Sequence, residues 1–508
     1  MSQTSLSKVY CAELDGINAK LIEVETDLNV GLHSFNIVGL ADKAVSEAKE
    51  RVSSAIKNAG AKPPNRENRK ITVNLAPADV KKAGSQYDLA IAIGYLLATG
   101  QMPLFDTSDK MFLGELALNG KTRKINGGLN FAMLAKKSGI KQVYLPAANG
   151  KEASLVKGIE IIPVKSLGEL VTHLAGTKTL EAHELTEFSP AEAFGVDISE
   201  IKGQPAAKRA IMIAASGGHN VLMSGPPGSG KTMLAQAINS ILPPLTLNEA
   251  IEASQIWSAA GLLEENYLDR RPFRSPHQTA SPASVVGGGS NPRPGEISLA
   301  HRGILFLDEF PEFRRDILES LRQPLESGKI VVSRAKGNLT FPARFILIAA
   351  MNPCPCGYAG DTEKECKCTA HEVSRYQKKI SGPLLDRIDI QIIVPRSKLE
   401  QLKKPAEDSK KIKDSVKRAR EVQKRRFEKA GLKIMVNSEM SSKDCERLAN
   451  LNEKAEEFVK NIFDKSLLST RGYYRILKTA RTIADLEESE QVGENHIAEA
   501  FQLRIREV

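Results

Sequence analysis

The chain has 508 residues, of which 41% are hydrophobic and 26% are charged, a globular composition too long for one ordinary core. No apolar run approaches the roughly 20 residues of a membrane span, and residues 1–8 lack the apolar segment of a signal peptide, so we expect a cytoplasmic protein without a membrane partner. The formal net charge of +10 favours a polyanionic partner such as nucleic acid, although charge alone does not establish one.

The residue pattern divides the chain into three predicted domains and one linker. Residues 1–175 alternate β-like runs with helical stretches, as a compact α/β domain does. The β-like runs are residues 20–24, 35–38, 71–75 and 142–145, and the helical stretches include 42–59 and 87–99. Periodicity is lost over residues 176–195, which we interpret as a linker. We expect a second α/β domain over 196–395 and a helical domain over 396–508.

A glycine-rich loop stands between a short apolar run at 220–224 and an apolar-periodic helix. The loop consists of Gly225, Pro226, Pro227, Gly228, Ser229, Gly230, Lys231 and Thr232. Glycines let backbone N–H groups turn inward around phosphates, Lys231 is suited to neutralise the β and γ oxygens, and the Thr232 hydroxyl is suited to bind Mg²⁺. An incidental lysine in a glycine turn is the alternative. The full match in strand, loop, helix order favours ATP and Mg²⁺ as ligands.

Two further apolar runs end in polar residues. Residues 304–307 are predicted to form a buried parallel strand that ends at Asp308 and Glu309. We expect Asp308 to hold Mg²⁺ through water and Glu309 to orient the attacking water. Residues 345–350 end before Asn352, a candidate sensor of the γ-phosphate; the alternative is an asparagine that forms a turn before a proline.

Several motifs together resemble one known family. They are the phosphate loop, PGEISLAH at 294–301, LDEF at 307–310, NPCPCG at 352–357 and SGPLLDRID at 381–389. These segments resemble the ComM/YifB family of magnesium-chelatase-like AAA+ proteins over essentially the whole chain. The resemblance implies an N-terminal Lon-protease-like (ribosomal-S5-type) α/β domain, an AAA+ P-loop α/β core and a C-terminal helical lid. It also implies a cytoplasmic hexameric helicase that promotes branch migration during natural transformation, when incoming single-stranded DNA is integrated.

The resemblance also assigns roles to individual residues. Arg387 resembles the arginine finger that reaches the γ-phosphate bound by the adjacent subunit, so a homo-oligomeric ring is implied. Arg471 resembles the sensor-2 arginine of the helical lid, and its alternative is a surface residue paired with an acid. In the first domain, the Lon pattern places Gln86, beside Ser85, at the nucleophile and Ala132 at the lysine. We therefore expect no Ser-Lys peptidase activity.

Cationic residues near the P-loop domain are candidate DNA contacts. Residues 329–332 and 339–341 are strand-like and flank a basic tip, a pattern that predicts a β-hairpin. In related ring helicases such a hairpin enters the pore, so Arg334 and Lys336 are candidate contacts to single-stranded or branched DNA. Arg274 and Arg293 belong to a Gly-, Ser- and Pro-rich insert at 272–295 that could form a second pore loop. A merely solvated hairpin is the alternative.

Four of the six cysteines fall in one short stretch. Cys354 and Cys356 form one C-x-C pair, Cys366 and Cys368 form another, and nine residues separate the pairs. Four thiolates in one loop suit a tetrahedral zinc ion, although C-x-C is less diagnostic than C-x-x-C. Four unligated thiols that act as small packing residues are the alternative.

The main competing function is that of a protein-remodelling ATPase. The magnesium-chelatase ATPase subunit is of that kind, and it acts on a partner that bears a D-x-S-x-S motif. That motif is absent here, and the basic balance of the chain favours DNA. The sequence therefore favours an ATP-hydrolysing DNA motor.

Overall fold

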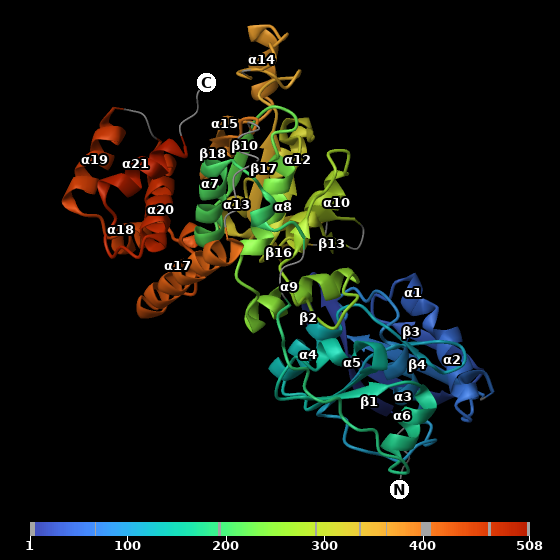
Figure 1. Cartoon of the computed structure of the whole chain (residues 1–508). Helices are drawn as coiled ribbons and strands as arrows, with labels where there is room; N and C mark the ends of the chain where they lie inside the picture. Colours follow the sequence, from blue (N-terminus) through green and yellow to red (C-terminus); the bar gives the residue numbers. More distant parts are fainter. Residues whose placement is uncertain are drawn as a thin grey trace. The chain divides into compact units, whose positions relative to one another are not determined.

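The computed structural model describes eight stretches of the chain: residues 6–66, 68–191, 195–289, 292–334, 337–361, 363–397, 408–465 and 469–504. They fall into two compact units (Figure 1). The N-terminal unit comprises Met1–Ser189 and Ala250–Leu268, and the P-loop unit comprises Pro190–Glu249 and Asp269–Val508. Residues 250–268 thus belong with the N-terminal unit although both flanking segments belong to the P-loop unit. No helix in the described stretches is both long and apolar enough to cross a membrane.

The N-terminal unit is built on a seven-stranded mixed sheet in the order β3-β4-β2-β1-β5-β8-β9. Its strands are β1 (Leu6–Asp15), β2 (Asn18–Val30), β3 (Ser34–Val38), β4 (Arg69–Ala76), β5 (Lys110–Phe112), β8 (Gln142–Pro146) and β9 (Glu160–Val164), and a separate ribbon pairs β6 (Glu115–Leu116) with β7 (Thr122–Arg123). β1 pairs antiparallel with β2 and parallel with β5. Buried and partly exposed residues alternate along β2, because successive side chains point to opposite faces of a strand.

Helices complete the core of this unit. They are α1 (Lys43–Ser46), α2 (Ala48–Asn58), α3 (Asp88–Ala98), α4 (Gly128–Lys137), α5 (Gly150–Ala153) and α6 (Leu167–Leu174), and α9 (Leu247–Ala260) runs into the inserted segment. Every residue of α3 is buried, as expected for a helix that is apolar on all sides. The α/β architecture predicted for this part of the chain is confirmed.

The P-loop unit contains a five-stranded parallel sheet in the order β11-β14-β17-β10-β18. The strands are β10 (Val221–Ser224), β11 (Phe273–Arg274), β14 (Ile304–Leu307), β17 (Ile346–Met351) and β18 (Ile390–Ile393). β10 is the first of these strands in the sequence. Two later strands, β17 and β18, pair with it on opposite sides, so the strand order reverses at β10. In such sheets the crevice at the carboxyl ends of the strands next to the reversal is where ligands bind.

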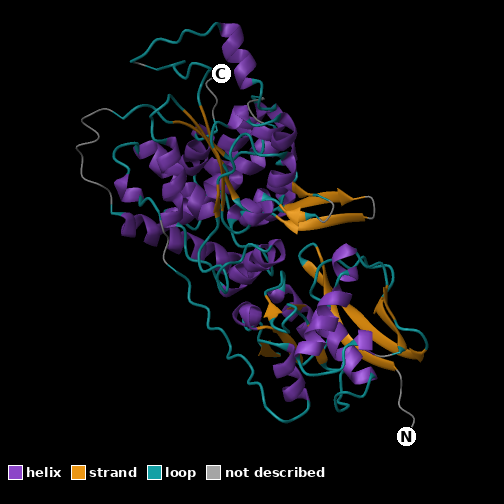
Figure 2. Ribbon diagram, turned by 90° about the vertical axis from the view of Figure 1, so that its right-hand side faces the viewer, coloured by secondary structure: helices purple, strands orange, loops and turns teal. Residues whose placement is uncertain are grey.

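Further helices and two strand pairs complete this part of the P-loop unit. They are α7 (Pro205–Gly217), α8 (Lys231–Ile241), α10 (Pro282–Val286), α11 (Glu296–Leu299), α12 (Arg315–Ser320), α13 (Pro324–Ser327), α14 (Ala370–Gln377), α15 (Gly382–Leu385), and the strand pairs β12 (Gly287–Gly288) with β13 (Arg293–Pro294) and β15 (Lys329–Arg334) with β16 (Gly337–Pro342). The β15–β16 hairpin is antiparallel, as predicted, and its strands extend beyond the helices of the P-loop unit in Figure 2.

The C-terminal part of the P-loop unit is helical, in agreement with the sequence expectation. Its helices are α17 (Ser409–Lys429), α18 (Ser442–Leu448), α19 (Glu453–Asp464), α20 (Thr470–Leu486) and α21 (Glu494–Gln502). Apolar residues of α20 such as Ile476 and Ile483 share one buried cluster with Ile211 of α7 and Val221 of the sheet. The helical lid and the sheet therefore share one hydrophobic core.

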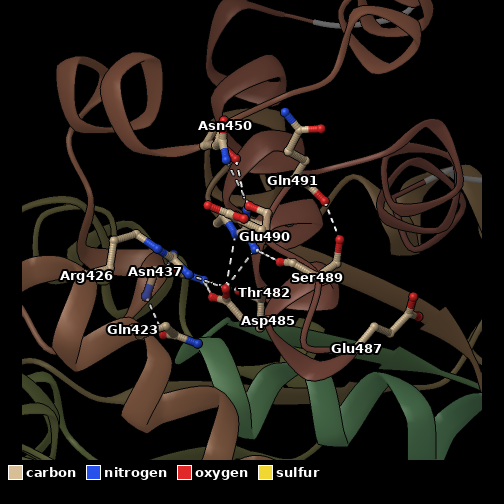
Figure 3. Close-up of polar contacts among 12 residues, drawn as sticks. Gln423, Arg426, Asn437, Asn450, Thr482, Asp485, Glu487, Ser489, Glu490 and Gln491 are labelled. Atoms are coloured by element: carbon tan, nitrogen blue, oxygen red, sulfur yellow. Dashed lines mark hydrogen bonds and ion pairs between the residues drawn. The ribbon is translucent and has the colours of Figure 1, made fainter.

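A buried polar network fixes the end of α20 (Figure 3). The carboxylate of Asp485 accepts hydrogen bonds from Arg426 of α17 and from Arg481, and it also accepts one of 2.9 Å from Nδ2 of Asn437. Arg481 is 2% exposed and donates to the carbonyl oxygens of Ser489 and Glu490 at 2.6 and 2.8 Å. Each buried charge is thus paired, which a stable low-dielectric interior requires.

Candidate nucleotide site

The phosphate loop joins β10 to α8 in a conformation that depends on glycine. A Cβ atom on Gly225 would lie 2.2 Å from the carbonyl oxygen of Val394, so no larger residue fits there. Gly228 and Gly230 adopt φ values of +77° and +89°, in the left-handed region that favours glycine. Gly230 is the N-cap of α8, so the free N–H groups of the first helical turn are available to an anion.

Lys231 begins α8, and its ammonium group lies over the loop. Nζ donates to the carbonyl oxygens of Gly225 at 2.8 Å and Pro226 at 3.0 Å, and it lies 3.5 Å from Oδ1 of Asn352. Burial lowers the pKa of Lys231, and the negative charge of Asp308 opposes that effect. Polyphosphate in this loop would supply further negative charge and so favour the charged lysine.

The ends of β10, β14 and β17 bring the predicted magnesium and sensor residues together. Oγ1 of Thr232 donates to Oδ2 of Asp308 at 3.0 Å, and the backbone N–H of Glu309 donates to the other carboxylate oxygen at 2.9 Å. Asn352 follows β17 and faces Lys231. Hydroxyl and carboxylate oxygens suit Mg²⁺, so Thr232 and Asp308 could hold the ion at this edge.

Glu309 differs from its neighbour in backbone and exposure. It has φ 51° and ψ 44°, a left-handed conformation that is costly for a residue other than glycine. Its side chain is exposed, whereas that of Asp308 is partly buried. Strained residues of this kind gather at functional sites, which agrees with the role predicted for Glu309.

Arg387 and Arg471 lie at the other edge of the sheet. β18 runs parallel to β10 with Val221 opposite Ile390, so Arg387, which precedes β18, is at the amino edge, whereas the phosphate loop is at the carboxyl edge. Arg387 is buried and bonds through Nε and Nη2 to Oε2 of Glu326, while Arg471 donates to Oε1 of the same carboxylate at 3.3 Å. The structure therefore brings these two predicted residues together, away from the phosphate loop of the same chain.

A cavity of about 470 Å³ opens around these two arginines. Asn220, Gly303, Phe345 and Asp389, which directly precede β10, β14, β17 and β18, line it and so place it at the amino edge. Its cationic lining residues are Arg271, Arg302, Arg344, Arg387, Arg420, Arg471, Arg475 and Lys478, and its acidic ones are Glu249, Glu326, Asp389 and Glu439. The surplus of positive charge makes this cavity attractive to a polyanion.

The sequence analysis did not single out Glu326, Arg475 or His219. Although burial opposes the ionisation of Asp389, Arg475 and His219 hold the pKa of its carboxyl group far below the usual value. Nε2 of His219 also lies 2.8 Å from Oγ1 of Thr482 on α20, so a buried chain of polar contacts links the segment that carries Arg387 to the lid. The only local signal was Asp389, at the end of the SGPLLDRID motif.

The predicted DNA contacts have different surroundings. Arg274 forms two hydrogen bonds of 2.5 and 2.7 Å with the carboxylate of Glu296, whereas Arg293 is exposed on β13. Lys336 and the side chain of Arg334 lie outside the described residues, although β15 ends at Arg334. The ion pair of Arg274 reduces the charge that it can offer to phosphate.

The four clustered cysteines meet in space. Their sulfur atoms all lie within 4.8 Å of one another, and Sγ of Cys354 is 3.4 Å from that of Cys356 and 3.6 Å from that of Cys366. The backbone N–H of Ala359 donates to Sγ of Cys354 at 3.3 Å. Such a donor set could hold a soft metal ion.

In the peptidase-like region of the N-terminal unit, the hydrogen-bond partner of the Ser85 hydroxyl is a carboxylate. Ser85 donates its hydroxyl hydrogen bond to Glu115, and Nε2 of Gln86 donates to Glu13 at 3.0 Å. Ala132, at the position expected for a catalytic lysine, is buried and apolar. Burial raises the pKa of Glu13 to about 7, and its hydrogen bonds from Tyr87 and Ala83 oppose that rise.

Comparison with known proteins identifies the family of this chain. Three family models match: magnesium chelatase, subunit ChlI, over residues 197–402; subunit ChlI of Mg-chelatase over 24–149; and the ChlI C-terminal region over 406–504. The competence protein ComM of Haemophilus influenzae is 42% identical over 512 residues, which cover 98% of this chain and 97% of that protein. The chain belongs to the ComM/YifB family.

Two further relatives fit this assignment. The YifB protein of Escherichia coli is 41% identical over 505 residues, covering 98% of this chain and 97% of that protein. A Lon protease of Rhizobium meliloti is 26% identical over 184 residues, which cover 34% of this chain and 22% of the protease. The ComM/YifB chain is therefore an AAA+ ATPase of the magnesium-chelatase type with Lon-like homology, as its motifs predicted.

Proposed function

We propose that this protein is an ATP-driven hexameric motor that acts on DNA, as a branch-migration helicase during natural transformation or homologous recombination. The catalytic residues would be Lys231, Glu309 and Asn352 from one subunit and Arg387 and Arg471 from the next. Thr232 and Asp308 would hold Mg²⁺.

The proposed ring of subunits is supported by the separation of two half-sites on one sheet. The phosphate loop, Asp308 and Asn352 lie at the carboxyl edge, whereas Arg387 and Arg471 lie at the amino edge and share Glu326. The half-site at the carboxyl edge offers a triphosphate Lys231 and the Mg²⁺-holding residues, and the half-site at the amino edge offers two further cations. A ring in which the amino edge of one copy meets the carboxyl edge of the next would complete every site.

The charges at the amino edge support that arrangement. The cavity has eight cationic and four acidic lining residues, a surplus that complements a nucleoside triphosphate bound by a neighbouring copy. In the isolated chain Glu326 pairs with both candidate arginines. An incoming γ-phosphate would replace this carboxylate as their partner, so the arginines would engage only when ATP is present.

DNA as the substrate rests on charge, on the hairpin and on the relative's name. The chain has a net charge of +10, β15 ends at Arg334, and Lys336 follows two positions later in the sequence, before β16. The Haemophilus influenzae relative is called a competence protein. Cations at a hairpin tip can follow a phosphate backbone without reading sequence, as a motor on single-stranded DNA requires. A protein-remodelling ATPase is the second candidate, supported by the magnesium-chelatase family match.

Mixed rings test the shared site. Lys231→Ala removes phosphate binding but leaves Arg387 intact, and Arg387→Ala does the reverse. Each variant alone should turn over ATP at least about 100-fold more slowly, whereas an equimolar mixture should regain activity at interfaces that combine the two intact halves. Mixing either variant with the double variant Lys231→Ala/Arg387→Ala is the matched control, and it should give no such gain.

Full ATPase activity of Arg387→Ala alone, or of a monomer, would refute the shared site. The substrate is tested separately by measuring ATP turnover with single-stranded DNA, with forked DNA and without DNA. Stimulation by DNA supports the motor. Failure of DNA to bind or to stimulate turnover would favour protein remodelling.

A further inference from the structure

The cysteine cluster has the dimensions of a tetrathiolate metal site. Three sulfur–sulfur distances are 3.4, 3.5 and 3.6 Å, close to the roughly 3.8 Å edge of a tetrahedron with zinc–sulfur bonds of about 2.3 Å. A disulfide would require about 2 Å. Two C-x-C pairs from the two ends of one loop supply the four sulfur atoms.

The surroundings argue against four packing thiols. Cys354 is buried, but Cys356, Cys366 and Cys368 are each partly exposed, unlike free cysteines in an apolar core. Most described residues between the two pairs are exposed or partly exposed, so the loop has little apolar surface to hold it together. A bound metal would offset the entropy cost of closing such a loop.

The same loop touches the nucleotide site at two places. Cys354 comes two residues after Asn352, whose Oδ1 lies 3.5 Å from Nζ of Lys231. Gly357, one residue beyond Cys356, is buried against Pro227 of the phosphate loop. A Cβ atom on Gly357 would lie only 2.7 and 2.8 Å from two ring carbons of Pro227. Along the sequence, the first cysteine pair therefore lies between the sensor residue, Asn352, and Gly357, which contacts the phosphate loop.

We propose that Cys354, Cys356, Cys366 and Cys368 bind one zinc ion and that the metal-held loop positions Pro227 and Asn352 for ATP. The metal would take no part in hydrolysis. It would fix the segment 352–357, so the phosphate loop and the sensor would keep their spacing when ATP enters. This inference rests on the proposed role of residues 225–232 as the ATP-binding loop.

Metal content and nucleotide affinity should be measured on the same full-length preparations. Wild-type protein should contain about one zinc per chain by mass spectrometry. Cys366→Ser/Cys368→Ser should lose the zinc and bind a fluorescent ATP analogue about tenfold more weakly, as displaced supporting residues usually cost. Cys445→Ala, which removes a buried thiol elsewhere in the P-loop unit, should change neither quantity. Thermal unfolding of each variant identifies a general loss of structure.

A glycine pair tests the contact without touching the metal ligands. Gly357 and Gly360 have φ values of +86° and +75°, but a Cβ on Gly360 would meet no atom within 4 Å. Gly357→Ala should therefore weaken ATP binding while zinc is retained, and Gly360→Ala, with similar backbone strain, should not. A wild-type protein without zinc would overturn the metal site. Unchanged ATP affinity in both the cysteine double variant and Gly357→Ala would overturn the coupling. A wild-type protein that binds zinc but no ATP would instead refute the proposed function.

Discussion

The hydroxyl of Thr232 donates a 3.0 Å hydrogen bond to the carboxylate of Asp308, a residue 76 positions further along the chain. This contact joins the last residue of the glycine loop to the residue that follows β14. It forms because β10 and β14 both pair with β17 and all three strands run parallel, so their carboxyl ends meet. The hydroxyl and the carboxylate that would hold Mg²⁺ are thus already adjacent.

Glu309→Gln should separate ATP binding from hydrolysis. The amide keeps the size of the side chain but cannot polarise water, so turnover should fall by about 100-fold or more while ATP affinity is retained. Steady-state phosphate release and equilibrium binding measure the two quantities.

The matched control for this variant is Glu312→Gln. Glu312 is exposed three residues away and pairs with Lys379 at 2.8 Å. Its loss should leave turnover unchanged. Equal activity of Glu309→Gln and wild type would remove Glu309 from the catalytic residues.

The hairpin tip should contribute to DNA affinity through charge. Arg334→Ala/Lys336→Ala should weaken binding of single-stranded DNA and reduce the slope of log affinity against log salt by about 1.4, because two phosphate contacts are lost. Fluorescence anisotropy over a salt series measures both, and ATP turnover without DNA should not change. Lys329→Ala removes a charge at the base of the same hairpin, and its effect should be smaller. A double variant with wild-type salt dependence would contradict the assignment.

Asp485→Asn should destabilise the lid. Arg426 and Arg481 both donate to this buried carboxylate, so its neutralisation removes the negative charge that both guanidinium groups contact. We expect a loss of about 3 kcal/mol in unfolding free energy, as for other broken buried pairs. Calorimetry and hydrogen exchange of peptides from α20 test this. Glu490→Gln is the control. The Glu490 side chain is exposed, and Arg481 donates to the backbone carbonyl oxygen of this residue, so the substitution leaves that hydrogen bond in place.

Stability of the N-terminal unit should depend on pH through Glu13. Burial raises the pKa of this carboxyl group to about 7, above its usual value, so the folded state binds more protons than the unfolded state between about pH 4.5 and 7. Stability is therefore lost as the pH rises through this window, by up to about 3 kcal/mol. Glu13→Gln should remove that loss and make thermal unfolding more similar at pH 5 and pH 8. Glu23→Gln, on the partly exposed face of β2, should keep the wild-type dependence.

The nucleotide-binding residues could be predicted because their signals are local. Each of these signals stands at the end of a short apolar run: residues 225–232, Asp308 with Glu309, and Asn352. Because the strands of a parallel sheet have their carboxyl ends at one edge, such residues are expected to lie close together. The acid that holds Arg387 could not be found in this way. Glu326 lies 61 residues before Arg387 and 145 before Arg471, and nothing in its own neighbours marks it.

The sequence by itself determined the sequence-local parts of this protein: the phosphate loop, the acidic strand end, the cysteine pairs and the alternation of helices and strands. Only the tertiary structure decided that Arg387 and Arg471 meet at the edge opposite the phosphate loop, that residues 250–268 join the N-terminal unit, and that Gly357 packs on Pro227. The reason is physical. Periodicity and turn chemistry act between neighbours along the chain, whereas strand order and the burial of charge are settled by contacts between residues far apart in sequence.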